Sequence, residues 1–470
     1  MGTSPLTITY FLFIQCIVLS SLIPTTLSLD ISLGGKGTGI SIGIGIGIGG
    51  SSPPSPSRNP PSPSRNPPSP SSSTVKPSDF KSCFLYRSYL VIQAFKKTIT
   101  CDPQRITNSW NGPDICGSYC GFYCEAPPGY SKDNVAVASV DFNGNALCSE
   151  HFDVFVGNLT ELALFHANSN NFTCGTPYIN QNVNPYFYEL DLSNNKLQGY
   201  FPQNAILSNL TFLDVRFNKY FGSVPSDVFG KLPYAIAIFL NNNKFNGYLP
   251  SNLGYSPVQY LSLANNLFTG PIPSSIGYAK NLLEVLFLNN QLSGCLPPEV
   301  GKVTKLTVFD AGFNYITGPI PYSYGCLKKI EQLNLAHNLL YGEVPEALCK
   351  LACTGHLMNL SLSYNYLTSL GPSCWELIKQ GSKKLDVSKN CIPWLPNQRS
   401  AEECWWFAKK PKTCPWSSYT PCWGASSEQI DSVSASEEKK APVKGKAGML
   451  GRKSGYRTYG ALDGSPKPRN

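Results

Sequence analysis

The chain has 470 residues, of which 42% are hydrophobic and only 14% are charged. This composition excludes a protein that is disordered throughout, and the length allows more than one domain. The formal net charge is +9, but residues 125–392 hold 16 Lys and Arg against 18 Asp and Glu, so the positive excess lies in the two ends. A basic face that binds nucleic acid is therefore not predicted.

Residues 1–28 are predicted to be a secretory signal peptide, because the apolar run from Tyr10 to Leu19 is followed by small residues up to Ser28. The apolar run is too short to span a membrane, and no later stretch of about 20 apolar residues occurs. Residues 29–76 form a Gly/Ile- and Pro/Ser-rich arm, in which the proline density favours extended polyproline II. These features predict a secreted, extracellular protein without a membrane span.

Residues 77–134 are predicted to form a Cys-rich N-terminal cap with an amphipathic helix and a Trp. One of the 17 cysteines lies in the signal peptide, and the compartment favours disulfides for the other 16. A zinc site at Cys116, Cys120 and Cys124 is not favoured, because no His lies near them in sequence. The disulfide candidates are Cys83, Cys101, Cys116, Cys120, Cys124, Cys148, Cys174, Cys349, Cys374, Cys391, Cys404, Cys414 and Cys422; among them Cys349 with Cys374, or Cys148 with Cys174, are proposed as pairs between neighbouring repeats.

Residues 135–392 repeat with a period near 24, as in YELDLSNNKLQGYFP and VQYLSLANNLFTGPIP. The pattern predicts about 11 leucine-rich repeats of the plant type, marked by GxIP. The repeat asparagines are Asn145, Asn170, Asn195, Asn218, Asn243, Asn266, Asn290, Asn314, Asn338, Asn365 and Asn390.

The letters of one repeat have physical reasons. The alternating apolar positions of LxxLxL give a short strand with one buried face. The asparagine amide is expected to bond the backbone of neighbouring loops, and Gly and Pro set the return on the other side. One unit cannot bury its apolar face alone, so the units stack. The predicted fold is an α/β-type leucine-rich repeat solenoid with a concave parallel β-sheet and disulfide-stapled caps.

Residues 393–424 are predicted to form a Cys-rich C-terminal cap, and residues 425–470 a disordered tail. Trp405, Trp406 and Phe407 are expected to cover the last layer of the core. The charged residues of the cap are expected to face water; these are Arg399, Glu402 and Glu403.

The segment NCIPWLPNQRSAEEC…F…PKTCP, residues 390–415, resembles the C-terminal cap of the plant leucine-rich repeat extensins. LALFHANSNNF and GCLPPEVG also look like repeats of that family. The chain departs from it in lacking the long C-terminal Ser-Pro-Pro-Pro-Pro region, so it resembles a short member. The resemblance implies a plant cell-wall protein that binds basic, Cys-rich peptides of the rapid alkalinisation factor type, and a repeat domain that tends to dimerise.

The position four before each repeat asparagine is expected to face outward on the concave sheet. It holds Asp at five of eleven repeats, with aromatic residues nearby, which suits a basic peptide or protein surface. Isolated Asp at this position is also common where it only keeps the face soluble. The candidate ligand-binding residues are Asp141, His166, Asp191, Asp214, Phe239, Tyr260, Asp310, Phe313, Tyr364 and Asp386.

Two other functions remain open: an inhibitor of pathogen wall hydrolases, similar to polygalacturonase-inhibiting proteins, and a structural wall glycoprotein held by its proline arm. For the binding module, another extracellular protein or wall polysaccharide remains open as an alternative partner to the peptide. An enzyme is not predicted, because no nucleophile, metal or paired-acid motif stands out, and no cofactor or metal is expected. Glycosylation is predicted at the sequons of Asn158, Asn171, Asn209 and Asn359.

Overall fold

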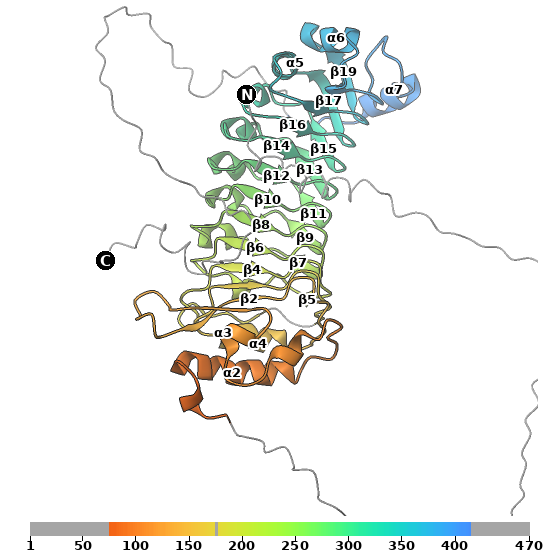
Figure 1. Ribbon diagram of the computed structural model, residues 1–470. Coiled ribbons are helices and arrows are strands. Elements are labelled where there is room, and N and C mark those ends of the chain that lie inside the picture. Colours follow the sequence, from red (N-terminus) through yellow and green to blue (C-terminus); the bar gives the residue numbers. More distant parts are fainter. Residues whose placement is uncertain (1–74, 174–176, 415–470) are drawn as a thin grey trace, which may run out of the picture. The chain divides into compact units, whose positions relative to one another are not determined.

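The computed structural model describes residues 75–173 and 177–414. The predicted signal peptide, the Gly/Ile- and Pro/Ser-rich arm, the C-terminal tail, Cys174 and Cys422 lie outside the described residues. Within the described ranges the chain forms a leucine-rich repeat solenoid, in which each repeat adds one layer to the stack (Figure 1). None of the helices in these ranges has the length and apolar content that crossing a membrane requires.

The main sheet contains one strand from each repeat. Each of these short strands buries its middle residue, such as Leu190, Leu213 and Ile238, and turns its flanking residues to the other face, because side chains alternate along a strand. All neighbours in this sheet are parallel except β1 and β2. Among the described residues its order is β1 (Phe122–Glu125), β2 (Ala136–Asp141), β3 (Leu164–His166), β4 (Glu189–Asp191), β6 (Phe212–Asp214), β8 (Ala237–Phe239), β10 (Tyr260–Ser262), β12 (Glu284–Leu286), β14 (Val308–Asp310), β16 (Gln332–Asn334), β18 (Asn359–Ser361) and β20 (Leu385–Asp386).

A second parallel sheet follows the repeat asparagines, and short helices return the chain on the remaining side. The strands of the second sheet are β5 (Gln198–Gly199), β7 (Lys219–Ser223), β9 (Lys244–Tyr248), β11 (Leu267–Gly270), β13 (Gln291–Cys295), β15 (Tyr315–Gly318), β17 (Leu339–Val344) and β19 (Tyr366–Leu370). The 3-10 helices are η1 (Pro77–Asp79), η2 (Ile106–Ser109), η3 (Gln203–Ala205), η4 (Val228–Lys231), η5 (Leu253–Tyr255), η6 (Ser274–Tyr278), η7 (Pro298–Lys302) and η8 (Tyr322–Cys326). The α-helices are α2 (Cys83–Lys96), α3 (Ile115–Ser118), α4 (Phe152–Asn158), α5 (Glu346–Cys353), α6 (Pro372–Lys379) and α7 (Ala401–Lys409).

The repeat asparagines join each repeat to the one before it. Asn290, for example, donates through Nδ2 to the carbonyls of Leu263, Phe287 and Leu288, and its Oδ1 accepts from the amide of Phe268 at 3.1 Å. The same four contacts recur at every repeat asparagine from Asn170 to Asn390. The predicted bonding of this amide to the neighbouring loops is confirmed, and it satisfies backbone groups that would otherwise be buried without partners.

The N-terminal end of the stack is covered by α2 (Figure 1). An aromatic cluster lies beneath this helix. Ser82 caps α2 by accepting from the amide of Leu85, and the helix buries Ile92 and Phe95. Phe95 stacks on Phe155 with ring centroids 4.1 Å apart, and the fully buried Trp110 packs in the same cluster. These residues shield the first layer of the core from water.

The C-terminal end differs from the sequence expectation. Leu385, Val387 and Ile392 are the buried residues at the last layer, whereas Trp405 and Trp406 are 53% and 59% exposed. The expectation that these two tryptophans cover the core is wrong, because α7 packs against the second sheet and buries none of its residues.

Two other residues of this cap, Phe407 and Arg399, both contact Tyr366. Phe407 stacks on Tyr366 of β19, with ring centroids 3.7 Å apart. Arg399 does not face water as expected: its Nε donates to the carbonyl of Asn365 at 2.7 Å and its guanidinium lies over the Tyr366 ring. Glu402 and Glu403 are exposed, as expected.

Disulfides connect the caps to the repeats. Cys349 bonds to Cys374, which is the pair predicted from neighbouring repeats, and Cys391 bonds to Cys404. Cys414 bonds to Cys295 of β13, which ties the end of the described chain back to the middle of the second sheet. Cys326, which was not a candidate, is also disulfide-bonded.

The predicted pairing of Cys148 with Cys174 is wrong. Cys148 bonds to Cys101, because the segment after α2 forms a bridge with the first repeat and brings these two residues together. Cys116 bonds to Cys124, so neither is a zinc ligand. The expectation of disulfides at Cys83 and Cys120 is also wrong, since both thiols are free and exposed. The thiol of Cys353 is free and exposed as well.

Candidate functional site

The residues four before the repeat asparagines form one continuous column across the main sheet. The strand register pairs Asp141 with His166, then Asp191 and Asp214, and continues in the same register to Asp386. We call this the aspartate column; its members are Asp141, His166, Asp191, Asp214, Phe239, Ser262, Leu286, Asp310, Asn334, Ser361 and Asp386. The sequence spacing therefore predicted the alignment of these residues.

A second column lies on the same face, two residues earlier in each strand. Because side chains alternate along a strand, residues two apart share a face. Of this flanking column, only Tyr260 and the sequon residue Asn359 were among the sequence candidates, although the same alternation identifies the others. Its members in register are Leu164, Glu189, Phe212, Ala237, Tyr260, Glu284, Val308, Gln332 and Asn359.

Burial of the aspartate column is greater than expected from its outward position. Asp214 and Ser262 are almost fully buried, and Asp310 is 6% exposed. Asp141, His166, Asp191 and Phe239 are half-buried, and Asp386 is exposed because no further strand follows β20. The candidate residues thus divide into a buried set and an accessible set.

The column has a structural role that the sequence reasoning missed. Asp191 Oδ1 accepts from the backbone amide of Ser193 at 2.9 Å, and Asp214 Oδ1 accepts from the amide of Arg216 at 3.0 Å. The same hydrogen bond, donated by the backbone amide two residues later in the chain, is accepted by the side chains of Asp141, Asp310, Asn334 and Asp386. Each such side chain ends its strand by holding the turn before the repeat asparagine. One carboxylate oxygen of each Asp is therefore already used by the fold.

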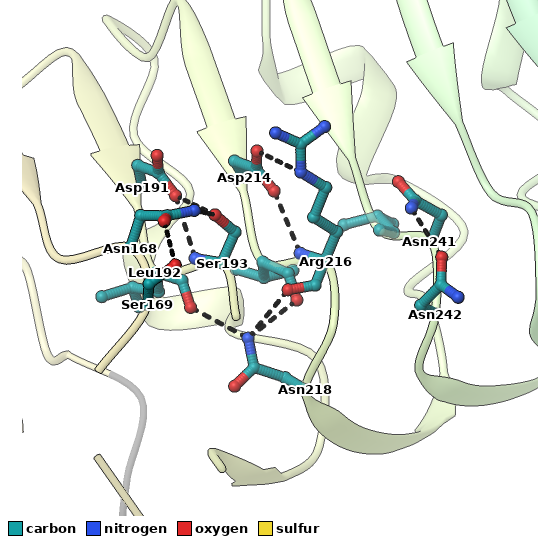
Figure 2. A network of polar contacts seen from close by, with 12 residues as sticks. Asn168, Ser169, Asp191, Leu192, Ser193, Asp214, Arg216, Asn218, Asn241 and Asn242 are labelled. Atoms are coloured by element: carbon teal, nitrogen blue, oxygen red, sulfur yellow. Dashed lines mark hydrogen bonds and ion pairs between the residues drawn. The ribbon is translucent and has the colours of Figure 1, made fainter. Parts of the chain in front are cut away.

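Figure 2 shows the centre of this arrangement, where Asp191 and Asp214 lie side by side at the ends of neighbouring strands. The Nε of Arg216 is 3.0 Å from Asp214 Oδ2, and its guanidinium lies over the ring of Phe239. Phe239 meets Phe212 edge to face at 5.9 Å. Burial raises the pKa of Asp214 well above its ordinary value, Asp191 raises it further, and the charge of Arg216 acts in the opposite direction.

His166 stands among acidic neighbours in the first repeats. Its Nε2 is 3.2 Å from Glu189 Oε2. Burial lowers the pKa of His166, but the bond to Glu189 and the charges of Asp191 and Asp141 outweigh burial and raise it above the ordinary value. The accessible carboxylates of β2 and β4 therefore surround a histidine that gains a proton as the pH falls.

Two carboxyl groups further along the face hold protons more tightly than usual. Burial raises the pKa of Asp310 to about 6. Burial and the nearby charge of Glu331 raise the pKa of Glu284 to about 7. The negative charge of this half of the face therefore increases over the range from acidic to neutral pH.

Phe313 and Tyr364 belong to a row of stacked rings beside the main sheet. His337 lies between them, with ring centroids 4.0 Å from each and interplanar angles of 13°. All three residues precede a repeat asparagine and have left-handed backbone with φ near 55°. The rings are about 40% exposed at Phe313 and 41% at Tyr364, so the row offers aromatic edges to solvent.

The four sequons lie at different places. Asn158 ends α4 and is exposed, while the side chains of Asn171 and Asn209 donate to backbone carbonyls. Asn359 begins β18 in the flanking column and is exposed. A glycan on Asn359 would therefore stand on the face of the main sheet, near β16 and β20.

Comparison with known proteins agrees with the repeat architecture. The family model for the leucine-rich repeat matches residues 257–279 and 329–351. The chain is 43% identical over 114 residues to leucine-rich repeat extensin-like protein 1 of Arabidopsis thaliana, covering 24% of this chain and 15% of that protein. It is 44% identical over 94 residues to the pollen-specific leucine-rich repeat extensin-like protein 2, covering 20% and 11%. The chain thus resembles leucine-rich repeat extensin-like proteins but matches only 15% and 11% of the length of these two.

Among solved structures, the Arabidopsis receptor kinase HAESA, in complex with the peptide hormone IDA and the co-receptor SERK1, has a TM-score of 0.53 and 26% identity. That likeness covers 65% of this chain and 54% of the matched chain in the solved complex. A plant ice-binding protein shares the fold, with a TM-score of 0.52 at 21% identity over 67% of this chain and 98% of that one. The solenoid described above is therefore one that plant leucine-rich repeat proteins adopt.

Proposed function

We propose that this chain, which resembles leucine-rich repeat extensin-like proteins, is a binding module of the plant cell wall. Its ligand is a basic, Cys-rich extracellular peptide of the rapid alkalinisation factor type. The ligand lies on the face of the main sheet formed by the aspartate and flanking columns. The chain is secreted in this proposal, because it carries the features of a signal peptide and many disulfides, which persist outside the cell.

The observation that carries the proposal is the acidic and aromatic surface over β2–β8. Asp141, Glu189 and Asp191 are accessible there, and Phe212 and Phe239 stand beside them. Arg216, at the centre of this part, is already paired with Asp214. An acidic surface with aromatic anchors complements a cationic peptide and speeds its encounter. Support for a peptide comes also from HAESA, which holds a peptide hormone in its solved complex.

Binding is favoured over catalysis by the use that the fold makes of its carboxyl groups. Asp310 has a raised pKa, as many catalytic acids do, yet it is buried and its Oδ1 accepts from the amide of Gly312. The raised pKa follows from that structural burial. A substrate has no access to this carboxyl group without displacing the turn.

The test is calorimetric titration of the secreted chain with a panel of basic, Cys-rich plant peptides at low and physiological salt. We expect micromolar or tighter binding to at least one peptide, weakened by salt. The variant Asp141→Asn/Asp191→Asn keeps an oxygen acceptor for both turns, and we expect it to bind about 10-fold more weakly. Asp227→Asn, an exposed Asp at the start of η4, is the matched charge control and is expected to leave affinity within about twofold.

Absence of binding to every peptide in the panel would overturn the proposal. If Asp227→Asn weakened binding as much as Asp141→Asn/Asp191→Asn does, the ligand would not lie on the main sheet. A second assay tests the chain as an inhibitor of a fungal polygalacturonase. If it inhibits that enzyme, and Asp141→Asn/Asp191→Asn weakens the inhibition, the hydrolase-inhibitor function replaces peptide binding.

A further inference from the structure

Helix α7 is held in place without the burial of its own side chains. Ser400 and Glu403 form a reciprocal capping box at its start. The Cys391–Cys404 disulfide ties it to the turn after the last repeat, and Phe407 fixes its end on Tyr366. No residue of α7 is buried. The helix is therefore a rigid platform whose remaining side chains are available to solvent.

The side chains on this platform are unusual for a surface. Trp405 and Trp406 are 53% and 59% exposed, and Trp394, in the turn joined to α7 by the disulfide, is 96% exposed. Tryptophan is seldom left this open to water, since its burial is strongly favourable. Trp110 in the N-terminal cap shows the usual outcome and is fully buried. The exposed rings at the C-terminal cap therefore indicate a surface that binds a ligand.

The same segment carries a net positive charge. Residues 389–412 contain five Lys and Arg but only two Glu, whereas residues 125–392 are nearly balanced. Lys409 Nζ lies 5.0 Å from the centroid of the Trp405 ring, and Lys410 is exposed next to it. Burial lowers the pKa of Lys412, and the charge of Lys410 lowers it further. Flat apolar rings and clustered cations therefore occur together on one surface.

We propose that this Trp–Lys surface, made by Trp405, Trp406, Lys409 and Lys410, binds an anionic polysaccharide built from uronic acids. The C–H face of a pyranose ring packs on a flat indole, and the carboxylate on the same sugar pairs with a neighbouring lysine. A neutral glycan would leave the lysines without partners. The charge and the rings together select a uronic-acid polymer.

An anionic membrane surface is the other occupant that tryptophan and lysine fit. The helix argues against it. Its sequence, AEECWWFAK, places Glu402 and Glu403 just before Cys404 and the tryptophans and offers no Leu, Ile, Val or Met to enter the acyl chains. The surface is thus mixed in polarity, which suits a sugar chain better than a lipid layer.

The experiment uses the full secreted chain and an oligogalacturonate as the probe, with its fully methyl-esterified form as the neutral control, by calorimetry at low and high NaCl. We expect the acidic oligomer to bind, the ester to bind at least about tenfold more weakly, and salt to weaken binding. Trp405→Ala/Trp406→Ala is expected to lower affinity about tenfold, comparable to the loss of one stacked ring. This variant changes no charge, so it separates the site from the lysines of residues 425–470.

Two matched controls locate the site. Tyr255→Ala/Tyr278→Ala removes a similarly exposed aromatic pair on the helical side, with ring centroids 5.6 Å apart. Lys219→Gln/Lys244→Gln removes two exposed lysines of the second sheet, for comparison with Lys409→Gln/Lys410→Gln. We expect both controls to bind within about twofold of the parent and Lys409→Gln/Lys410→Gln to bind about fivefold more weakly with a shallower salt dependence. Trp405→Phe/Trp406→Phe should restore most of the affinity lost in the alanine variant.

Three outcomes overturn the proposal: no binding of the oligogalacturonate by the parent chain, unchanged affinity in Trp405→Ala/Trp406→Ala, or equal binding of the methyl ester. The proposal would also fail if the chain bound phosphatidylserine vesicles through the two tryptophans and did not bind the oligomer. The ligand of this surface would then be an anionic membrane. Because α7 buries neither tryptophan, the melting temperature should stay unchanged in the alanine variant, which keeps loss of binding distinct from loss of fold.

Discussion

Arg216 Nε lies 3.0 Å from Asp214 Oδ2, in an ion pair whose side chains are only 9% and 1% exposed. The pair is held between the strand end of β6 and the ring of Phe239, so neither charge has ready access to water. An ion pair in such a place contributes little net stability, because desolvation offsets most of the attraction, but the loss of one partner leaves the other buried and uncompensated.

This pair gives the first prediction. Arg216→Met is expected to destabilise the chain by about 3 kcal/mol, because it leaves the Asp214 carboxyl group without its counter-charge. Asp214→Asn/Arg216→Met removes both charges, keeps the acceptor for the amide of residue 216, and should recover most of that loss. The free energies of unfolding in urea check both. A double variant less stable than the single one would contradict the assignment of the cost to the unpaired charge.

The second prediction concerns pH. A carboxyl group whose pKa is raised in the folded state holds a proton that the unfolded chain has lost, so its contribution to stability is present at low pH and lost as the pH rises through the folded pKa. For Asp310, with a folded pKa of about 6, this removes about 1–2 kcal/mol between about pH 5 and pH 7.5. Glu284 acts in the same direction.

Asp310→Asn tests this effect. Asn334, the next member of the column, already accepts from the amide two positions on, so asparagine fits the turn. Between about pH 5 and pH 7.5, the free energy of unfolding of Asp310→Asn should change by about 1–2 kcal/mol less than that of the parent chain. A matched control is Asp386→Asn at the exposed end of the column, whose pH profile should follow the parent.

The third prediction separates the repeat asparagine from the asparagine before it. Asn290→Ala removes three donated bonds and one accepted bond in a buried turn and should cost roughly 2–4 kcal/mol. Asn289→Gly removes an exposed side chain that donates to Asn265, fits the left-handed backbone of residue 289 (φ 52°), and should cost less than about 1 kcal/mol. Similar losses in both variants, measured by denaturant unfolding, would refute the ladder as the stabilising element.

The fourth prediction uses two glycines of neighbouring 3-10 helices. A Cβ on Gly254 of η5 would lie 1.7 Å from the carbonyl oxygen of Ser275, so Gly254→Ala forces two repeats apart and should lower the free energy of unfolding by several kcal/mol, about 3 or more. A Cβ on Gly230 of η4 would meet only the Asn252 side chain at 3.2 Å, and neither glycine has a positive φ. Gly230→Ala should therefore change stability by less than about 1 kcal/mol, as thermal unfolding can show.

The sequence predicted the stack itself with good detail. The period of the asparagines, the alternation in LxxLxL and the turn residues of GxIP each follow from local chemistry that repeats unchanged along the chain. The bonding of the repeat asparagines to neighbouring loops and the register of the aspartate column could be stated before the structure, because every layer is built by the same local rule. The Cys349–Cys374 disulfide followed from the same spacing.

Predictions failed where one non-repeating segment meets another. Cys148 bonds to Cys101 because the cap folds back onto the first repeat, and that contact has no period to reveal it. Trp405 and Trp406 looked like core residues by type, but the packing of Phe407 on Tyr366 turns α7 toward the second sheet and leaves them in water.

The sequence by itself determined a leucine-rich repeat solenoid, the positions that face out from its main sheet, and the residues that join its layers, because these depend on short-range periodicity. Only the tertiary structure decided which of those positions are accessible. Asp214 and Asp191 occupy the same place in adjacent repeats, yet Arg216 and Phe239 cover the first and leave the second half-open. Burial, and with it charge and the capacity to bind, depends on the neighbours that side chains from adjacent layers supply.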